Sequence, residues 1–298
     1  FIALFFQVGG FPRVVFNVVL GGGVVGGRLV AHKKVKGILF VGSDATGQKI
    51  LQAVQGAPEK ICVLEMGGKN AAIVFPDADW EGALEACLRS ALATTGQRCT
   101  SLSRLILHRS IAKKFTERFV EAMASLPVGH YLDPKARMGP LVDSGAQKKF
   151  LRYQKLATRE GAKVLLSGKK LKLKHPGYYV SPGVHSISSG PAKKIKAGYR
   201  YDEIFGPDVA IYTFGSLEEA VHLHNDSRYG LVASVFTASK KRFRELLPRL
   251  EVGNLFWNRP TIGASGKLPF GGIKASGNHF PAGLFSPYFC TYPLAIQE

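Results

Sequence analysis

The stretch Gly37-Ile38-Leu39-Phe40-Val41-Gly42-Ser43-Asp44-Ala45-Thr46-Gly47 joins an apolar strand pattern to a glycine turn and the start of a helix. The alternation continues on both sides, with strand patterns at residues 14–19 and 61–65 and helix patterns at 26–31 and 46–55. Strands that alternate with helices in this way predict a parallel sheet covered by helices. The fold class that we expect is therefore α/β.

The rest of the chain continues in the same manner. Apolar spacing predicts helices over residues 80–93, 111–126 and 147–160. Strands are expected over residues 104–108 and 254–258, and over 286–296, which has aromatic and β-branched residues.

Composition limits the kind of protein. The 298 residues are 46% hydrophobic, which is enough for a large core, and no apolar run reaches the length of a membrane span. No signal peptide is expected, because the apolar start at residues 1–6 lacks a basic region and a cleavage site. The four scattered cysteines form no CxxC pair, which fits a reducing compartment rather than a zinc or disulfide framework.

The net charge of +19 is the unusual bulk property. Basic residues cluster at 169–175 and 193–196, among Gly, Pro and Ser. We interpret these clusters as a solvated basic surface, with binding of a polyanion such as nucleic acid as the alternative.

Two glycine-rich segments are candidates for a cofactor phosphate site. Residues 42–47 end a strand and begin a helix, so free backbone N–H groups and the positive end of the helix dipole would face a bound anion. Residues 21–26 match the G-x-G-x-x-G fingerprint, but the run of three glycines makes an accidental match easy. We favour residues 42–47, and simple tight turns are the alternative for both segments.

Cys99, in Gly96-Gln97-Arg98-Cys99-Thr100, is the candidate nucleophile. The charge of the neighbouring Arg98 is expected to favour the thiolate, which is the reactive form of a cysteine. Cys62, Cys87 and Cys290 are interpreted as small apolar residues of the core.

Glu65, in Glu65-Met66-Gly67-Gly68-Lys69, is the candidate general base. It ends an apolar strand, where partial burial should raise its pKa toward neutrality. The alternative is a structural ion pair between Glu65 and Lys69.

The order and spacing of these two motifs resemble the aldehyde dehydrogenase superfamily. The resemblance extends through residues 40–47, Glu203-Ile204-Phe205-Gly206-Pro207 and Pro269-Phe270-Gly271-Gly272-Ile273-Lys274-Ala275-Ser276-Gly277. It implies the C-terminal part of a dinucleotide-binding domain in residues 1–67, a catalytic domain in 68–277 and an oligomerisation segment with a terminal strand in 278–298. A homodimer or homotetramer and a cytoplasmic location are implied as well.

The resemblance implies NAD-dependent oxidation of an aldehyde to a carboxylic acid, with NADP as the alternative cofactor. Cys99 would form the thiohemiacetal and the thioester, its own N–H would bind the oxyanion, and Glu65 would activate the water that hydrolyses the thioester. The 42–47 loop would lie against the cofactor diphosphate, Glu203 would bind the nicotinamide ribose, and Phe205 would pack near the nicotinamide ring.

Within the superfamily, residues 65–70, 257–260 and 277–281 are similar to a bacterial subgroup that oxidises N-succinylglutamate 5-semialdehyde in arginine catabolism. This substrate is multiply anionic, so we expect Arg98 and Arg259 to hold its carboxylates, with structural salt bridges as the alternative. Competing hypotheses are a different aldehyde, a truncated relative that only binds partners, and nucleic-acid binding. No metal site is expected.

Two departures from the family pattern affect these expectations. The family usually has Thr where Asp44 stands, and an acid there is expected to repel phosphate unless it caps the helix from outside. The resemblance also begins inside the family chain, so a further oxyanion donor and the adenosine-ribose residues would belong to an N-terminal part that this sequence does not show. We expect a chain of this length to be inactive or poorly folded alone, and a longer parent to be active.

Overall fold

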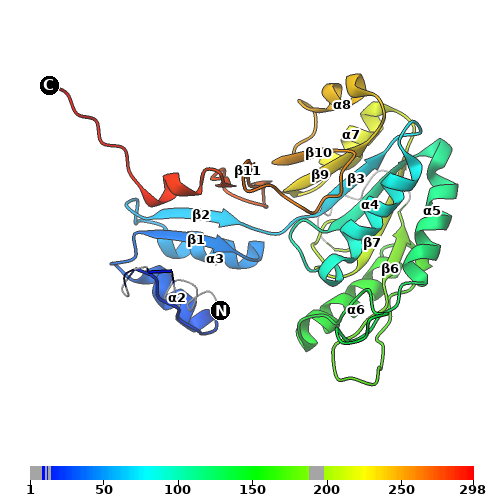
Figure 1. Cartoon of the computed structure of the whole chain (residues 1–298), viewed down its shortest axis with the longest axis horizontal. Coiled ribbons are helices and arrows are strands. Elements are labelled where there is room, and N and C mark those ends of the chain that lie inside the picture. The colour runs from blue at the N-terminus through cyan, green and yellow to red at the C-terminus, as the bar shows by residue number, and fades with distance from the viewer. Residues whose placement is uncertain (1–8, 11, 13–14, 188–197) are drawn as a thin grey trace.

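The computed structural model describes residues 9–10, 12, 15–187 and 198–298, and it is an α/β structure with two main sheets (Figure 1). The smaller sheet consists of β1 and β2, and the larger sheet has the strand order β10-β9-β3-β4-β7-β6-β5. The α/β class predicted from the sequence is therefore confirmed.

The described helices are α2 (Gly23–Ala31), α3 (Asp44–Val54), α4 (Trp80–Leu92), α5 (Arg109–Ala124), α6 (Ser144–Arg159), α7 (Leu217–Asn225) and α8 (Lys240–Leu246), with short 3₁₀ turns η1 (Ala93–Gly96) and η2 (Ser286–Cys290). The strands are β1 (Gly37–Val41), β2 (Ile61–Glu65), β3 (Asn70–Val74), β4 (Leu102–His108), β5 (Lys163–Leu166), β6 (Gly183–Ser186), β7 (Asp208–Phe214), β8 (Tyr229–Gly230), β9 (Val232–Phe236), β10 (Asn254–Trp257), β11 (Pro269–Phe270), β12 (Ile273–Lys274) and β13 (Ala282–Gly283).

The smaller sheet is the β-α-β unit predicted from residues 37–65. β1 and β2 are parallel, with Gly37 opposite Ile61 and Val41 opposite Glu65, and α3 connects them. Ile50, Leu64 and Met66 form its buried core. In Figure 1 this unit extends to one side of the larger sheet.

The strand predicted at residues 14–19 is wrong for the residues that are described. Val15 to Val19 have no regular secondary structure, and Val15 and Val19 are 64% and 60% exposed. Val14 lies outside the described residues. A strand needs a neighbour to pair its backbone groups, and no described strand pairs with this segment, so its apolar composition alone misled the prediction.

The larger sheet is parallel except at one edge, where β5 runs antiparallel to β6. β3 lies between β9 and β4, and all five of its residues are buried. The local sequence does not predict this strand, because Asn70 and two alanines give a weak β signal.

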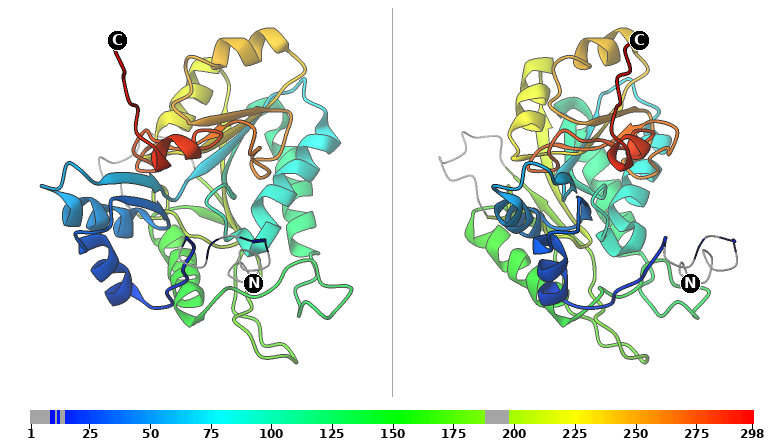
Figure 2. Two further views of the ribbon diagram at one scale, coloured as in Figure 1. Left: turned by 60° about the vertical axis from the view of Figure 1, so that its left-hand side comes forward. Right: turned by 90° about the vertical axis from the view of Figure 1, so that its left-hand side faces the viewer.

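Helices cover both faces of the larger sheet. On one face α4 and α5 pack against Ala72, Val74 and Leu105, and on the other α6, α7 and α8 pack against Ile73 and Ile106. Figure 2 shows these layers from two further directions. The helices predicted over residues 80–93, 111–126 and 147–160 are α4, α5 and α6, with bounds shifted by up to three residues.

The C-terminal strand predicted at residues 286–296 differs from the structure. The segment forms the 3₁₀ turn η2, and residues 291–298 are irregular and exposed. Aromatic and β-branched composition favours a strand only where a neighbouring strand offers backbone partners, and no described strand lies beside this segment.

Of the two basic clusters, lysines 169, 170, 172 and 174 are exposed. Residues 193–196 lie outside the described residues. No described helix is both long enough and apolar enough to cross a membrane.

Candidate active site

Cys99 and Glu65 come together at the amino ends of the central strands. Glu65 is the last residue of β2, and the chain then crosses from one sheet to the other to enter β3 at Asn70. Cys99 lies just before β4, the parallel neighbour of β3. The Asn70 side-chain amide donates to the carbonyl oxygens of Cys99 at 2.7 Å and Ser101 at 2.9 Å, so it fixes the Cys99 turn against β3.

The backbone before Cys99 is left-handed at three successive residues. Thr94, Thr95 and Gly96 have φ values of 54°, 58° and 69°. A Cβ on Gly96 would lie 2.3 Å from the carbonyl oxygen of Gly206, so only glycine allows the 203–207 loop to approach this turn. Residues with unfavourable φ are stabilised only by their surroundings, and they occur often at functional sites.

The Cys99 thiol is half-buried, and burial raises its pKa. The negative charges of Glu203 and Glu65 raise the pKa further. The backbone N–H groups of Cys99 and Thr100 oppose this rise. These two N–H groups also provide the donors that an oxyanion beside the sulfur would need.

The expected role of Arg98 in lowering the Cys99 pKa is therefore corrected. The Arg98 side chain is exposed, and its Nε donates to the hydroxyl of Thr94 at 2.8 Å. The guanidinium is thus bound within the turn that carries it. The backbone N–H groups of Cys99 and Thr100 favour the thiolate instead.

Glu65 is 8% exposed, and neither carboxylate oxygen has a hydrogen-bond partner of ordinary geometry among the described residues. Burial raises its pKa to about 7, and only a weak interaction with the backbone N–H of Ala282 opposes the shift. A carboxylate in this state can accept a proton near neutral pH, as predicted for a general base.

The alternative of a Glu65–Lys69 ion pair is not supported. The Lys69 ammonium points away and donates to the carbonyl oxygens of Tyr199 at 3.1 Å and Asp202 at 2.8 Å. Lys69 therefore holds the loop that leads to Glu203 and leaves Glu65 unpaired.

Glu203 and Phe205 reach the same region on the loop before β7. The Glu203 carboxylate accepts from the N–H of Gly68 at 2.9 Å, and a Cβ on Gly67 would lie 2.3 Å from it. Burial raises the pKa of Glu203, while the Gly68 N–H and nearby lysines lower it. Phe205 is 40% exposed, and it lines one small cleft with Arg98 and Glu203.

The 42–47 loop lies where β1 ends and α3 begins. The Ser43 hydroxyl caps α3 by accepting from the N–H of Thr46 at 3.3 Å. The N–H groups of Asp44 and Ala45, at the start of the helix, have no intrahelical partners. A Cβ on Gly47 would lie 2.3 Å from the sulfur of Met66, so this glycine allows α3 to pack against the residue after Glu65. The 42–47 loop thus packs beside the segment that carries Glu65, and its free N–H groups suit a cofactor phosphate.

The competing fingerprint at residues 21–26 lies at the start of α2. No strand precedes it in the described residues, although the dinucleotide motif requires one.

Arg259 lies near the Cys99 turn. Two residues further on, the Thr261 hydroxyl donates to the carbonyl oxygen of Thr100 at 2.7 Å. Arg98 and Arg259 are both exposed, and the described residues offer neither of them an ion pair. The alternative of structural salt bridges therefore has no support in this part of the chain.

The C-terminal motif hydrogen-bonds the chain on both sides of Glu65. The Ser276 hydroxyl donates to the carbonyl oxygen of Gly67 at 2.7 Å and accepts from the N–H of Gly230 at 3.0 Å. The Asn278 side chain accepts from the N–H of Leu64 and donates to the carbonyl oxygen of Cys62, so it extends the edge of β2.

Four residues that position the candidate active site were not predicted from the sequence: Asn70, Arg228, Ser276 and Asn278. Ser276 stands in a quoted motif, but nothing in the sequence indicates that its hydroxyl contacts Gly67. Arg228 pairs with Asp44 from 184 residues away, which no local pattern could show.

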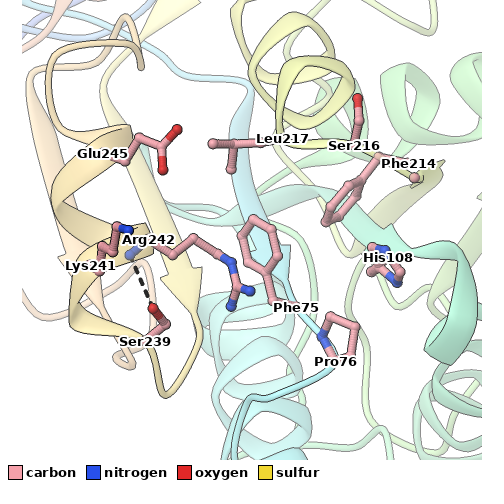
Figure 3. Close-up of a pocket in the computed structure, with 11 residues that line it drawn as sticks. Phe75, Pro76, His108, Phe214, Ser216, Leu217, Ser239, Lys241, Arg242 and Glu245 are labelled. Carbon is pink, nitrogen blue, oxygen red and sulfur yellow. Dashed lines mark hydrogen bonds between the residues drawn. The ribbon is translucent and has the colours of Figure 1, made fainter.

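A separate groove of about 410 Å³ lies at the opposite, carboxyl ends of the strands (Figure 3). Phe75, His108 and Phe214 line it, together with Arg242 of α8. None of the predicted site residues is among its lining residues. Within the described ranges no group of three His, Cys, Asp or Glu side chains is arranged to hold a metal ion.

Comparisons with known proteins find aldehyde dehydrogenases at the level of family, sequence and structure. The profile of the aldehyde dehydrogenase family matches residues 1–291. N-succinylglutamate 5-semialdehyde dehydrogenases of Serratia proteamaculans and Acinetobacter baylyi are 36% and 33% identical to this chain. Each alignment covers 98% of this chain and 58% of the relative, so the chain spans just over half the length of these relatives.

Solved structures are similar as well. A putative aldehyde dehydrogenase from Burkholderia cenocepacia has a TM-score of 0.88 and 35% identity over 97% of this chain and 58% of its own. Betaine aldehyde dehydrogenase from Staphylococcus aureus in complex with NAD+ has a TM-score of 0.86 and 29% identity, covering 94% and 55%. A glyceraldehyde-3-phosphate dehydrogenase from Methanocaldococcus jannaschii, complexed with NADP, has a TM-score of 0.82 and 30% identity, covering 94% and 58%.

Proposed function

The chain belongs to the aldehyde dehydrogenase family, and on this premise we propose that the protein oxidises an aldehyde to a carboxylic acid with a nicotinamide cofactor. The observation that supports the proposal most is the buried, unpartnered carboxylate of Glu65, three residues before Gly68, which lies against the Cys99 carbonyl oxygen. A nucleophile and a base close together are what a covalent mechanism with a hydrolytic second half requires.

In the proposed first half, the Cys99 thiolate attacks the aldehyde carbon and forms a thiohemiacetal. The N–H groups of Cys99 and Thr100 stabilise the oxyanion. Only the thiolate attacks, so the thiol first loses its proton to water; because its pKa is raised, the thiolate is the minor form at neutral pH.

The 42–47 loop, Glu203 and Phe205 are the residues that would hold the cofactor, and NAD is the form that we propose. When bound, the nicotinamide supplies the acceptor for the hydride that the thiohemiacetal loses. The free N–H groups at the start of α3 fit its diphosphate, and the Glu203 carboxylate fits a ribose hydroxyl.

In the second half, Glu65 takes a proton from the water that hydrolyses the Cys99 thioester. A pKa of about 7 suits this task, because the carboxylate is both available and basic near neutral pH. The product is a carboxylic acid, and the thiol is restored.

N-succinylglutamate 5-semialdehyde is the substrate that we propose, as the relatives' names suggest. Arg98 and Arg259 would hold its carboxylates, since both guanidinium groups are exposed near the Cys99 turn. The proposal also includes a role in arginine catabolism, a cytoplasmic location and assembly as a homo-oligomer. We also propose the division into residues 1–67, 68–277 and 278–298.

A substrate panel tests the proposal. Formation of the reduced cofactor is measured with N-succinylglutamate 5-semialdehyde, a neutral aliphatic aldehyde and betaine aldehyde. We expect the highest kcat/KM with the first, no turnover by Cys99→Ser, and a KM raised about tenfold by Arg259→Ala for the anionic substrate only. Equal kcat/KM for all three aldehydes would remove the substrate assignment, and turnover by Cys99→Ser would remove the mechanism.

A further inference from the structure

The Arg228 side chain reaches the start of α3. It stands between α7 and β8, and its Nη2 donates to the Asp44 carboxylate at 2.9 Å and to the Tyr229 hydroxyl at 3.1 Å. Asp44 is the first residue of α3, directly after the Ser43 cap. The Arg228 guanidinium therefore lies beside the helix terminus that the proposed function assigns to the cofactor diphosphate.

The guanidinium is held in place from several sides. It lies over the Tyr229 ring, 5.0 Å from the centroid, and the N–H of Ala275 donates to the Arg228 carbonyl oxygen at 3.0 Å. Tyr229 pairs with Lys274 in the β8–β12 ladder. This support reduces the side-chain entropy that a ligand contact would cost.

The Arg228 guanidinium interacts with several carboxylates. The carboxylates of Asp44 and Asp202 raise its pKa, although burial opposes them, and its own charge lowers the pKa of Glu203. The guanidinium thus contacts the first residue of α3 and interacts electrostatically with Glu203, the candidate ribose-binding carboxylate.

Asp44 alone would repel a phosphate at this point, because a carboxylate at the first helical position faces the same N–H groups that attract an anion. The ion pair with Arg228 cancels that charge. Arginine has five N–H donors, and no hydrogen bond of Nε or Nη1 to another described residue is seen.

We infer that Arg228 is a cofactor-binding residue, aligned by Asp44, that donates to the diphosphate of the nicotinamide cofactor. The inference rests on the proposed function and deepens it. It also gives Asp44 a purpose, which is to orient an arginine at a position where the family usually has Thr.

Calorimetric titration with NAD+ and with inorganic pyrophosphate tests the inference without relying on turnover. We expect Arg228→Ala to raise Kd about tenfold or more for both probes, and Arg228→Lys to retain part of the affinity. Asp44→Thr should weaken binding less than Arg228→Ala does, because it loses the contact that aligns the guanidinium but also removes a repulsive charge. The matched control is Arg242→Ala, which breaks a comparably exposed 2.7 Å ion pair with Asp77 at the far groove and should leave Kd unchanged.

The possible results separate the inference from the proposal beneath it. If the Kd of the Arg228→Ala variant for NAD+ and pyrophosphate stays within twofold of the parent value, only the role of Arg228 is overturned. Equal weakening by Arg228→Ala and Asp44→Thr would also overturn it, because the pair would then act only as a bridge between the two parts. Absence of saturable binding by the parent chain would overturn the proposed cofactor site, and the inference with it.

Discussion

Glu65 combines two properties that oppose each other. Its carboxylate is buried without a hydrogen-bond partner of ordinary geometry among the described residues, which costs folding free energy whenever the group is charged. The same burial raises its pKa to about 7, which is the property that a general base needs. A residue of this kind is expected where function and stability conflict.

The conflict predicts a pH-dependent effect of Glu65→Gln on stability. The pKa in the folded state is above the ordinary value, so the folded state binds more protons than the unfolded state between about pH 4.5 and pH 7. The parent therefore loses stability as pH rises through this window. The neutral glutamine avoids the loss, and we expect the variant to be more stable by about 2 kcal/mol at pH 8 and by little at pH 5.

Urea denaturation at pH 5 and pH 8 measures this difference. Glu81→Gln is a suitable control, because the Glu81 side chain is 72% exposed and should show little change at either pH. A stabilisation by Glu65→Gln of equal size at both pH values would show that the charge of Glu65 is not its cause.

The raised pKa of Cys99 predicts how its thiol reacts. Glu203→Gln removes a negative charge that disfavours the thiolate, while its side-chain oxygen can still accept from Gly68. We expect the thiol pKa to fall and the rate of alkylation by iodoacetamide at pH 8 to rise, by roughly tenfold for each unit of pKa. Peptide mass spectrometry distinguishes Cys99 from the other three cysteines. Slower or unchanged alkylation of Cys99 in the variant would contradict this electrostatic account.

At the scale of elements, β3 organises the site. It is the buried strand from which Asn70 donates to the Cys99 and Ser101 carbonyls and accepts from the N–H of Val232 at 3.1 Å. One side chain thus connects β3 with the Cys99 turn and with β9.

Asn70→Ala should therefore harm both stability and reactivity. It leaves buried backbone groups unpaired, so we expect a loss of about 3 kcal/mol in the free energy of unfolding. The Cys99 turn should become more mobile, with faster exchange of the Cys99 and Thr100 amides. Gln48→Ala on the exposed face of α3 is the control and should change stability by less than about 0.5 kcal/mol. A loss below 1 kcal/mol for Asn70→Ala would show that the turn is held by other contacts.

Elements that could be predicted are those whose signal is local. The α4, α5 and α6 helices follow from apolar spacing, and β1 and β2 follow from apolar runs bounded by glycine and proline or charged residues. The strands expected at 14–19 and 286–296 failed because a strand depends on a partner, which an apolar composition does not supply. β3 was missed for the opposite reason: its partners β4 and β9 make it a strand despite a weak local pattern.

At the scale of the whole molecule, the candidate site lies where the two sheets meet. Glu65 and the 42–47 loop come from the smaller sheet, while Cys99 and Glu203 lie on loops of the larger one. Arg228 directly precedes β8 of the two-stranded β8–β12 sheet. The crossing at residues 66–69 and the hydrogen bonds of Ser276 and Asn278 hold the two parts together.

The motifs around Glu65 and Cys99 could be identified from sequence, because glycines beside a carboxylate and a thiol form a local signal. Their environment could not. It depends on which loops meet at the site. This decides where Lys69 points, that Arg98 contacts Thr94, and that Arg228 pairs with Asp44.

The most direct measurement of the central claim is the intact mass of the Glu65→Gln chain after mixing with NAD+ and N-succinylglutamate 5-semialdehyde. If Cys99 is the nucleophile and Glu65 the base of hydrolysis, the variant should accumulate one acyl group on Cys99, with one equivalent of reduced cofactor. The parent should clear the adduct, and Cys99→Ser should form none. An adduct on another residue, or none in the Glu65→Gln chain, would contradict the account.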